Sequence, residues 1–170
     1  MSDEVPAIAQ AVVDLLNSRA YAIHPDKLDD PALTYALLSP FGQDSPDVPP
    51  QRLDLVRGLR ANLMALVDED TAAGWAAFTE RAAATTFRHD FATPGEVRLR
   101  QVAGDPVVGG ITVAVASLVE SETWSRVRAC ANDVCHEVFY DTTRSRTRRW
   151  HSYEICGNRA NVAAHRARVR

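Results

Sequence analysis

Residues 130–156 read CANDVCHEVFYDTTRSRTRRWHSYEIC and contain all three cysteines of this chain of 170 residues. Four residues separate Cys130 from Cys135, and four residues also separate His151 from Cys156. Structural zinc sites use four tetrahedral ligands, which are thiolates or imidazoles. We therefore predict that Cys130, Cys135, His151 and Cys156 bind one zinc ion.

Other histidines compete for the fourth ligand position. His136 directly follows Cys135, and His165 lies nine residues after Cys156, but the spacing of His151 repeats that of the first pair. Four protein ligands leave no open position for water or substrate, so we expect a structural site. Three inert buried cysteines are one alternative, and a redox pair is another, although C-x4-C is wider than the C-x-x-C of thioredoxin-like sites.

The zinc-binding segment is expected to fold as a knuckle, a hairpin and a helix. Residues 131–134 favour a turn, residues 138–140 have strand character, and residues 147–152 are expected to form the returning strand. Cys156 is expected near the start of a helix, where the helix dipole favours a thiolate. This order resembles a treble-clef arrangement, and zinc can contribute about 10–16 kcal/mol to the folding of so short a segment.

The preceding residues have mainly helical periodicity. Helices are expected at residues 7–20, 32–38, 51–68 and 107–123, and strand alternation appears at 96–102. In the clearest helix we expect an apolar face of Leu55, Leu59, Leu63, Leu66 and Val67, with Arg52, Arg57 and Arg60 mostly off it. The predicted fold class is mainly α with a small β element, comprising a helical N-terminal domain (1–123) and a C-terminal treble-clef-like zinc finger (124–170).

Charge is distributed unevenly along the chain. Residues 1–125 carry nine basic and 18 acidic side chains, a net −9, whereas residues 126–170 carry ten arginines and four acidic side chains, a net +6. Lys27 is the one lysine of the chain, and the codon bias of a GC-rich genome is one explanation for the use of arginine instead of lysine. That codon bias does not explain why the excess of arginine lies at one end of the chain. Arginine suits phosphates and guanine edges.

The C-terminal segment resembles the CGNR zinc-finger family. The matching features are the C-x4-C knuckle, the aromatic-Asp step at residues 139–141, the Arg-Arg-Trp at 148–150 and the Cys-Gly-Asn-Arg at 156–159. Family members usually have cysteine at the position of His151, so this site would carry one less negative charge. The resemblance implies a bacterial protein that acts as a stress-linked transcription regulator.

Residues ahead of the finger resemble the ABATE domain, the usual N-terminal partner in that family. The resemblance rests on Asp14-Leu15-Leu16-Asn17-Ser18-Arg19, on the acidic step at residues 26–31 and on Leu59-Arg60.

We expect the finger to bind nucleic acid, with DNA the preferred partner, and a homodimer is possible. Arginine pairs with phosphate and releases counterions. The candidate nucleic-acid-binding residues are Arg144, Arg146, Arg148, Arg149, Arg159, Arg166 and Arg168. The main alternative is a zinc-stapled protein–protein interaction module, in which the acidic body or a second subunit neutralises these arginines.

The sequence also bears on two further hypotheses, a small-molecule effector site and an enzyme activity. Asn17, Ser18 and Arg19 are candidate groups for a small-molecule effector, although polar residues are ordinary at a helix end. No Ser-His-Asp set, phosphate loop or open metal site appears, so we expect no enzyme activity. No apolar run is long enough to span a membrane, and the acidic N-terminus lacks the basic opening of a signal peptide, so we expect a cytoplasmic location.

Overall fold

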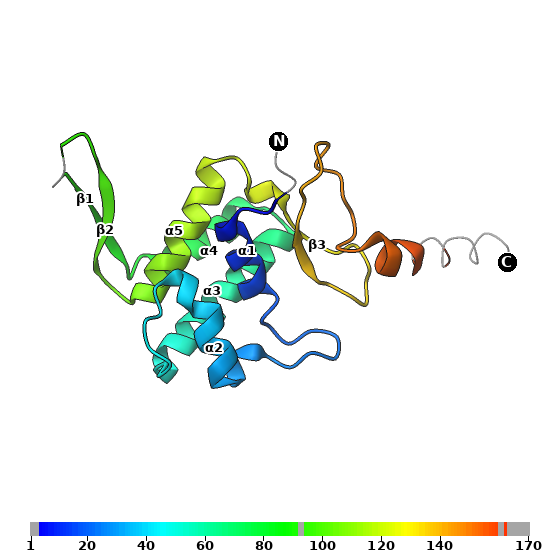
Figure 1. The fold of residues 1–170 in the computed structure, drawn as a ribbon, viewed down its shortest axis with the longest axis horizontal. Helices are drawn as coiled ribbons and strands as arrows, with labels where there is room; N and C mark the ends of the chain where they lie inside the picture. The colour runs from blue at the N-terminus through cyan, green and yellow to red at the C-terminus, as the bar shows by residue number, and fades with distance from the viewer. Residues whose placement is uncertain (1–3, 92–93, 160–161, 163–170) are drawn as a thin grey trace.

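A computed structural model describes residues 4–91, 94–159 and 162 of the chain. Five α-helices in this part of the chain form a bundle, and two short antiparallel hairpins flank it (Figure 1). The helices are α1 (Ala7–Leu16), α2 (Pro31–Leu38), α3 (Pro50–Asp68), α4 (Ala72–Ala82) and α5 (Pro106–Glu120). The strands are β1 (Thr86–Asp90), β2 (Arg98–Ala103), β3 (Val127–Ala129) and β4 (Val138–Tyr140). The predicted class, mainly helical with a small β element, is confirmed.

Short single turns complete the described elements. The 3₁₀ turns are η1 (Lys27–Asp29), η2 (Ser39–Phe41) and η3 (Trp124–Arg126), and η4 (Tyr153–Gly157) is a π turn. Among the described residues, no helix has the length and apolarity that crossing a bilayer requires.

Side-chain caps fix where several helices begin. Asp30 accepts hydrogen bonds from the amides of Ala32 and Leu33 at the start of α2, and Asp105 caps α5 in the same way. A proline occupies the first turn of both helices, where its missing N–H has no intrahelical partner to lose. The cap and the proline let α5 begin at Pro106 although its first turns contain Gly109 and Gly110, and glycine disfavours helix.

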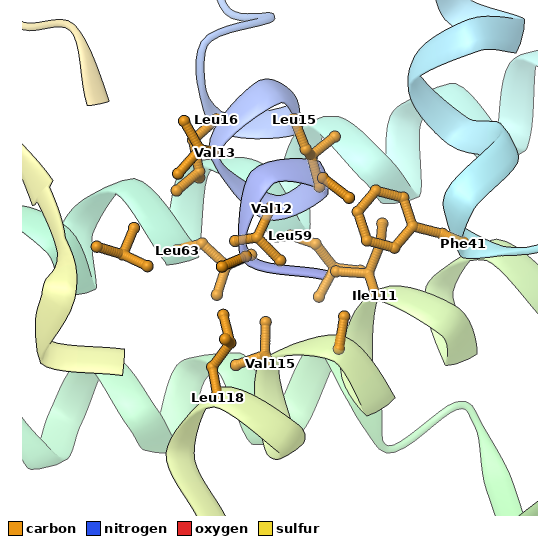
Figure 2. Close-up of a cluster of buried hydrophobic side chains, with 14 of the residues drawn as sticks. Val12, Val13, Leu15, Leu16, Phe41, Leu59, Leu63, Ile111, Val115 and Leu118 are labelled. Atoms are coloured by element: carbon orange, nitrogen blue, oxygen red, sulfur yellow. The ribbon is translucent and has the colours of Figure 1, made fainter. Parts of the chain in front are cut away.

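The hydrophobic core lies between α1, α3 and α5. Figure 2 shows side chains of the three helices pointing toward one another, among them Val12, Leu63 and Val115, each at most 1% exposed. The same cluster continues beyond the bundle into the C-terminal segment. Its members there are Trp124, Val127, Val138 and Tyr140. The helical body and the β3–β4 hairpin consequently share one core.

The predicted apolar face of α3 is wrong at two positions. Leu55 is 44% exposed, and Val56 is buried in its place. Arg60, expected off this face, is buried and forms an ion pair with Asp26 and a 2.7 Å hydrogen bond to the Ser18 hydroxyl. These contacts bury the Arg60 side of α3 against the segment that follows α1.

The predicted returning strand at residues 147–152 is also wrong. The partner of β4 is β3, which precedes the cysteine knuckle, with Arg128 opposite Phe139. Residues 147–152 form no strand because their backbone groups bond elsewhere. The Arg148 amide donates to the Asp141 carboxylate, and the Arg149 carbonyl accepts from the Ala131 amide at 2.8 Å.

Candidate metal centre

The four predicted ligands converge at one point. The ligand atoms of Cys130, Cys135, His151 and Cys156 all lie within 4.8 Å of one another. Nδ1 of His151 is 3.3 Å from Sγ of Cys135 and 3.7 Å from Sγ of Cys156. Tetrahedral zinc with bonds of about 2.3 Å to sulfur and about 2.0 Å to nitrogen separates such atoms by about 3.5 Å. Donor type and spacing therefore fit a zinc ion.

A tight turn presents the first two thiols. Cys130 follows β3 directly, and its amide donates to the Glu137 carbonyl at 2.8 Å. The Cys135 amide donates to the Asn132 carbonyl at 2.8 Å, which closes the turn between the two thiols. The next residue, His136, adopts a left-handed backbone (φ 55°) and has an exposed side chain. His136 is thus outside the cluster, and the competing His165 lies outside the described residues.

The second ligand pair comes from the segment after the basic loop. Cys156 is buried in the π turn at Tyr153–Gly157, and the Ser152 hydroxyl accepts from the Ile155 amide at the start of this turn. Helical structure continues through Arg159, the last described residue before residue 162. The helix therefore begins slightly before Cys156, and the ligand lies in its first turn, close to the predicted position.

Glu137 orients the histidine, a role that sequence reasoning missed. Its Oε2 lies 3.3 Å from Nε2 of His151, on the side of the ring away from the thiols. A metal-binding histidine usually donates its second N–H to a carboxylate or carbonyl group, which fixes the ring orientation. The ring geometry therefore assigns Nδ1 to the metal and Nε2 to Glu137.

Burial affects the protonation of the thiols. Loss of solvent and, to a smaller extent, the adjacent Cys130 and Cys156 sulfurs together raise the pKa of Cys135 to about 12. A thiol with such a pKa is neutral at pH 7 unless a cation replaces its proton. Metal binding at this cluster must therefore release protons.

The arginine-rich loop after β4, residues 141–149, is built around a buried carboxylate. We call this segment the basic loop. Asp141 is fully buried and accepts hydrogen bonds from the amide and hydroxyl of Thr143 and from the Arg148 amide, and it lies 3.6 Å from Arg128. Burial alone would raise the pKa of Asp141, but these hydrogen bonds and Arg128 bring it below the ordinary value. Asp141 therefore holds the loop in shape through its charged carboxylate form.

Polar groups at the C-terminal end of α1 attach the metal centre to the body. The Asn17 side chain donates to the Val138 carbonyl and accepts from the Val138 amide, both at 2.8 Å. Arg19 donates to the His136 carbonyl and, at 2.8 Å, to the Leu16 carbonyl. Asn17, Ser18 and Arg19, the candidate effector groups, are therefore occupied by contacts within the protein.

The predicted nucleic-acid-binding arginines fall into different environments. Arg144, Arg149 and Arg159 are exposed, and none forms an ion pair within the described residues. Arg149 also lies over the ring of half-buried Trp150, 5.2 Å from its centroid. Arg166 and Arg168 lie outside the described residues.

Two of the predicted arginines join the basic loop to backbone carbonyls of neighbouring segments. The Arg148 guanidinium lies over the Phe139 ring and donates to the carbonyls of Trp150 and His151. Arg146 has a left-handed backbone (φ 54°), and its guanidinium donates to the Glu122 carbonyl at 3.3 Å.

Residues 126–169 match the family model of the CGNR zinc finger. All four clustered ligands lie inside this match, and so do Asp141 and the basic loop. The family match and the donor set agree on a structural zinc ion held by Cys130, Cys135, His151 and Cys156. No curated protein matches the chain.

Proposed function

We propose that the CGNR finger binds DNA and that the protein acts as a transcription regulator. In this proposal the knuckle and the following ligand-bearing helix form a treble-clef-like finger. Residues 1–123 act as an ABATE-like domain in a stress-linked response, which rests on the resemblance in their sequence. The proposal gives the chain no catalytic step and places it in the cytoplasm.

The observation that carries the proposal is the exposure of finger arginines without acidic partners. Among the described residues, the ion pair formed by a finger arginine joins Arg128 to Asp141, which belongs to the finger itself. No ion pair joins the described finger arginines to a carboxylate of residues 4–125. The acidic body therefore leaves Arg144, Arg149 and Arg159 available to phosphates, which supports the proposal over internal neutralisation.

Within the finger, each group has a distinct task. Zinc, when bound, supplies a fixed cross-link between the knuckle and the helix, and it takes no part in chemistry. Asp141 and Arg148 hold the basic loop in shape, so Arg144 and Arg149 are presented without the entropic cost of ordering a free loop. In this proposal Arg159, exposed on the helix after Cys156, contributes a further phosphate contact.

A salt titration of DNA binding tests the proposal. We expect the affinity of the zinc-loaded full chain for duplex DNA to fall steeply with salt, measured by fluorescence anisotropy. In the double variant Arg144→Ala/Arg149→Ala, the slope of log K against log salt should decrease by about 2, because each lost phosphate contact removes about 0.9. Arg81→Ala, which removes an exposed arginine of α4, is the control. Equal slopes for the double variant and the wild type would contradict the proposal.

A second candidate, an interaction module, has one observation in its favour. Tyr153 and Ile155 are 60% and 53% exposed, and Val162 is 49% exposed seven residues after Ile155. Exposed apolar side chains beside a rigid zinc centre suit protein docking. Zinc-loaded protein that shows no DNA affinity even at low salt would favour this function instead.

A further inference from the structure

The hairpin of β1 and β2, described for residues 86–91 and 94–103, projects from the helical body at the end of the molecule opposite to the zinc finger (Figure 1). We call it the arm. Its sheet has only two strands among the described residues, and no backbone hydrogen bond to another described segment extends it beyond β1. An isolated two-stranded hairpin is marginally stable in water, and further strands or a packed helix are needed for stability.

One face of the arm is apolar and uncovered. Residues alternate between the faces of a strand, so Phe87, His89 and Phe91 share one side. In the hairpin register Leu99 lies opposite His89, and Val97 continues the same face. Phe91, Val97 and Leu99 are 74%, 55% and 54% exposed. Apolar exposure on this scale at a free strand edge is typical of a surface that pairs with another chain.

The other face of the arm has an unfavourable charge arrangement in the single chain. Arg88 of β1 lies directly opposite Arg100 of β2. Like charges at directly opposed positions destabilise a sheet. Arg100 lies 4.0 Å from Asp90, and no ion pair within the described residues includes Arg88. A carboxylate beside Arg88, at the outer edge of β1, would therefore offset the repulsion between Arg88 and Arg100.

The sequence of β1 supplies that carboxylate when it meets a copy of itself. Residues 87–91 read Phe-Arg-His-Asp-Phe, which is self-complementary about His89. In an antiparallel pair of β1 strands centred on His89, Arg88 lies opposite Asp90 of the second copy, and Phe87 lies opposite Phe91. Centring the pair on Arg88 or Asp90 would instead oppose two arginines or two aspartates.

We propose that the arm is a homodimerisation element in which the β1 edges of two copies pair antiparallel about His89. The product is a four-stranded sheet in the order β2-β1-β1-β2, with the apolar faces of both arms on one side. Each Arg88 gains the other copy's Asp90 as a partner. The zinc fingers, at the opposite end of each chain, remain free for their own partner.

The size of the contact sets the expected strength. Two paired edge strands bury less than the standard interface of about 1,600 Å². The dimer should therefore be a weak one that dissociates on dilution. Sedimentation velocity of the full zinc-loaded chain, over a concentration series spanning the micromolar range, should show a reversible monomer–dimer equilibrium. A monomer throughout this series would overturn the proposal.

Charge exchange tests the register. Arg88→Asp alone, or Asp90→Arg alone, places like charges opposite each other and should weaken the dimer at least tenfold. The double exchange Arg88→Asp/Asp90→Arg keeps the composition of the wild type and restores opposite charges, so it should recover dimerisation. Double-exchange protein that stays as weak as the single variants, with an unchanged circular dichroism spectrum, would overturn the pairing.

A cysteine pair gives a second readout that does not depend on charge. Directly opposed residues in an antiparallel sheet have Cβ atoms about 4.5–5.5 Å apart. His89→Cys should therefore form a disulfide-linked dimer under mild oxidation, whereas Arg88→Cys, which faces Asp90, should not. Equal cross-linking of the two variants, measured against the wild type on a non-reducing gel, would overturn the register.

The apolar face has its own matched control. Phe91→Ser should weaken the dimer severalfold, while Ile23→Ser, at a position 92% exposed on the body, should leave it unchanged. A dimer that is insensitive to Phe91→Ser would contradict the arm as its contact. Loss of DNA affinity in Arg88→Asp without any change in oligomeric state would instead indicate that the arm binds DNA.

Discussion

The two hairpins of this molecule share a two-stranded antiparallel topology but differ in what surrounds them. All three residues of β4 are buried, and β3 and β4 pack into the body core beside the metal cluster. No residue of β1 or β2 is fully buried. A short hairpin is stable when something covers or clamps it. In β3–β4 that support comes from the core, from Asn17 and from the metal ligands, whereas in the arm the proposed dimer supplies it.

Removing a metal ligand should have the largest effect on this comparison. Cys156→Ser leaves three ligands, and zinc binding contributes on the order of 10–16 kcal/mol in isolated fingers. We expect loss of stoichiometric zinc and of amide protection over residues 130–156, measured by metal analysis and hydrogen exchange. Val134→Ser, an exposed change within the same knuckle, is the control and should retain zinc. A fully protected finger in Cys156→Ser would contradict the role of the ion.

Breaking the buried ion pair of the body should have the next largest effect. Arg60→Met leaves the Asp26 carboxylate and the Ser18 hydroxyl without their donor, and the side chains of Arg60 and Asp26 are 7% and 18% exposed. Removing one partner of a buried pair costs about 3 kcal/mol in the free energy of unfolding. Arg57→Met removes a more exposed pair with Asp29 from the same helix and should cost less than about 1 kcal/mol. Similar costs in denaturant unfolding would refute this ranking.

The same substitution in each hairpin compares their surroundings directly. Val138 is 1% exposed in β4, and Val102 is 49% exposed in β2. Val138→Ala should lower the free energy of unfolding by about 2 kcal/mol, because it removes buried methyl groups and leaves a cavity. Val102→Ala should change it by less than about 0.5 kcal/mol in dilute protein. A cost at Val102 as large as that at Val138 would show that the arm is supported within the single chain.

Removing the Asn17 hydrogen bonds that join α1 to β4 should have a similar or smaller effect. Asn17→Ala removes both hydrogen bonds to Val138, which are worth about 1–3 kcal/mol together. Hydrogen exchange should report faster exchange in β4, with the ligands still binding zinc. Gln10→Ala, which removes an exposed amide of the same helix, serves as the control. Unchanged exchange in β4 would mean that the core alone holds the hairpin.

The smallest expected effect is a change in pH dependence. Burial opposes ionisation of Asp26, but the hydrogen bonds from Arg60 and Leu28 outweigh it and bring the pKa of Asp26 below its ordinary value of 3.8. A depressed pKa in the folded state stabilises the fold above the unfolded pKa, and this contribution is lost as pH falls through the folded pKa. Asp26→Asn should therefore show a shallower loss of stability than the wild type below about pH 4. Parallel curves would contradict the assignment.

Local chemistry explains which features could be predicted from the sequence. The ligand set was predictable because zinc restricts both residue type and spacing, and all four ligands lie within 27 residues. The helices were predictable from their apolar period and their caps. The role of Asn17 was not, because its partner Val138 is 121 positions away and leaves no local pattern.

The errors have a similar physical origin. The sequence predicts that Arg60 lies off the buried face of α3, because charged side chains are normally exposed, and only the folded chain brings Asp26 and Ser18 to it. The sequence predicts a strand at residues 147–152 as the returning strand of a hairpin, but the Asp141 carboxylate accepts from a backbone amide that a strand would need. Long-range polar contacts thus decided the positions where local patterns failed.

Hydrogen exchange of the two hairpins, with and without a strong chelator, tests the central claim most directly. The account predicts one zinc per chain in the purified protein. It also predicts that chelation removes amide protection from residues 130–156 and leaves exchange in β1, β2 and α3 unchanged. Metal-free protein whose residues 130–156 stay protected in chelator would contradict the claim that a structural ion holds the finger.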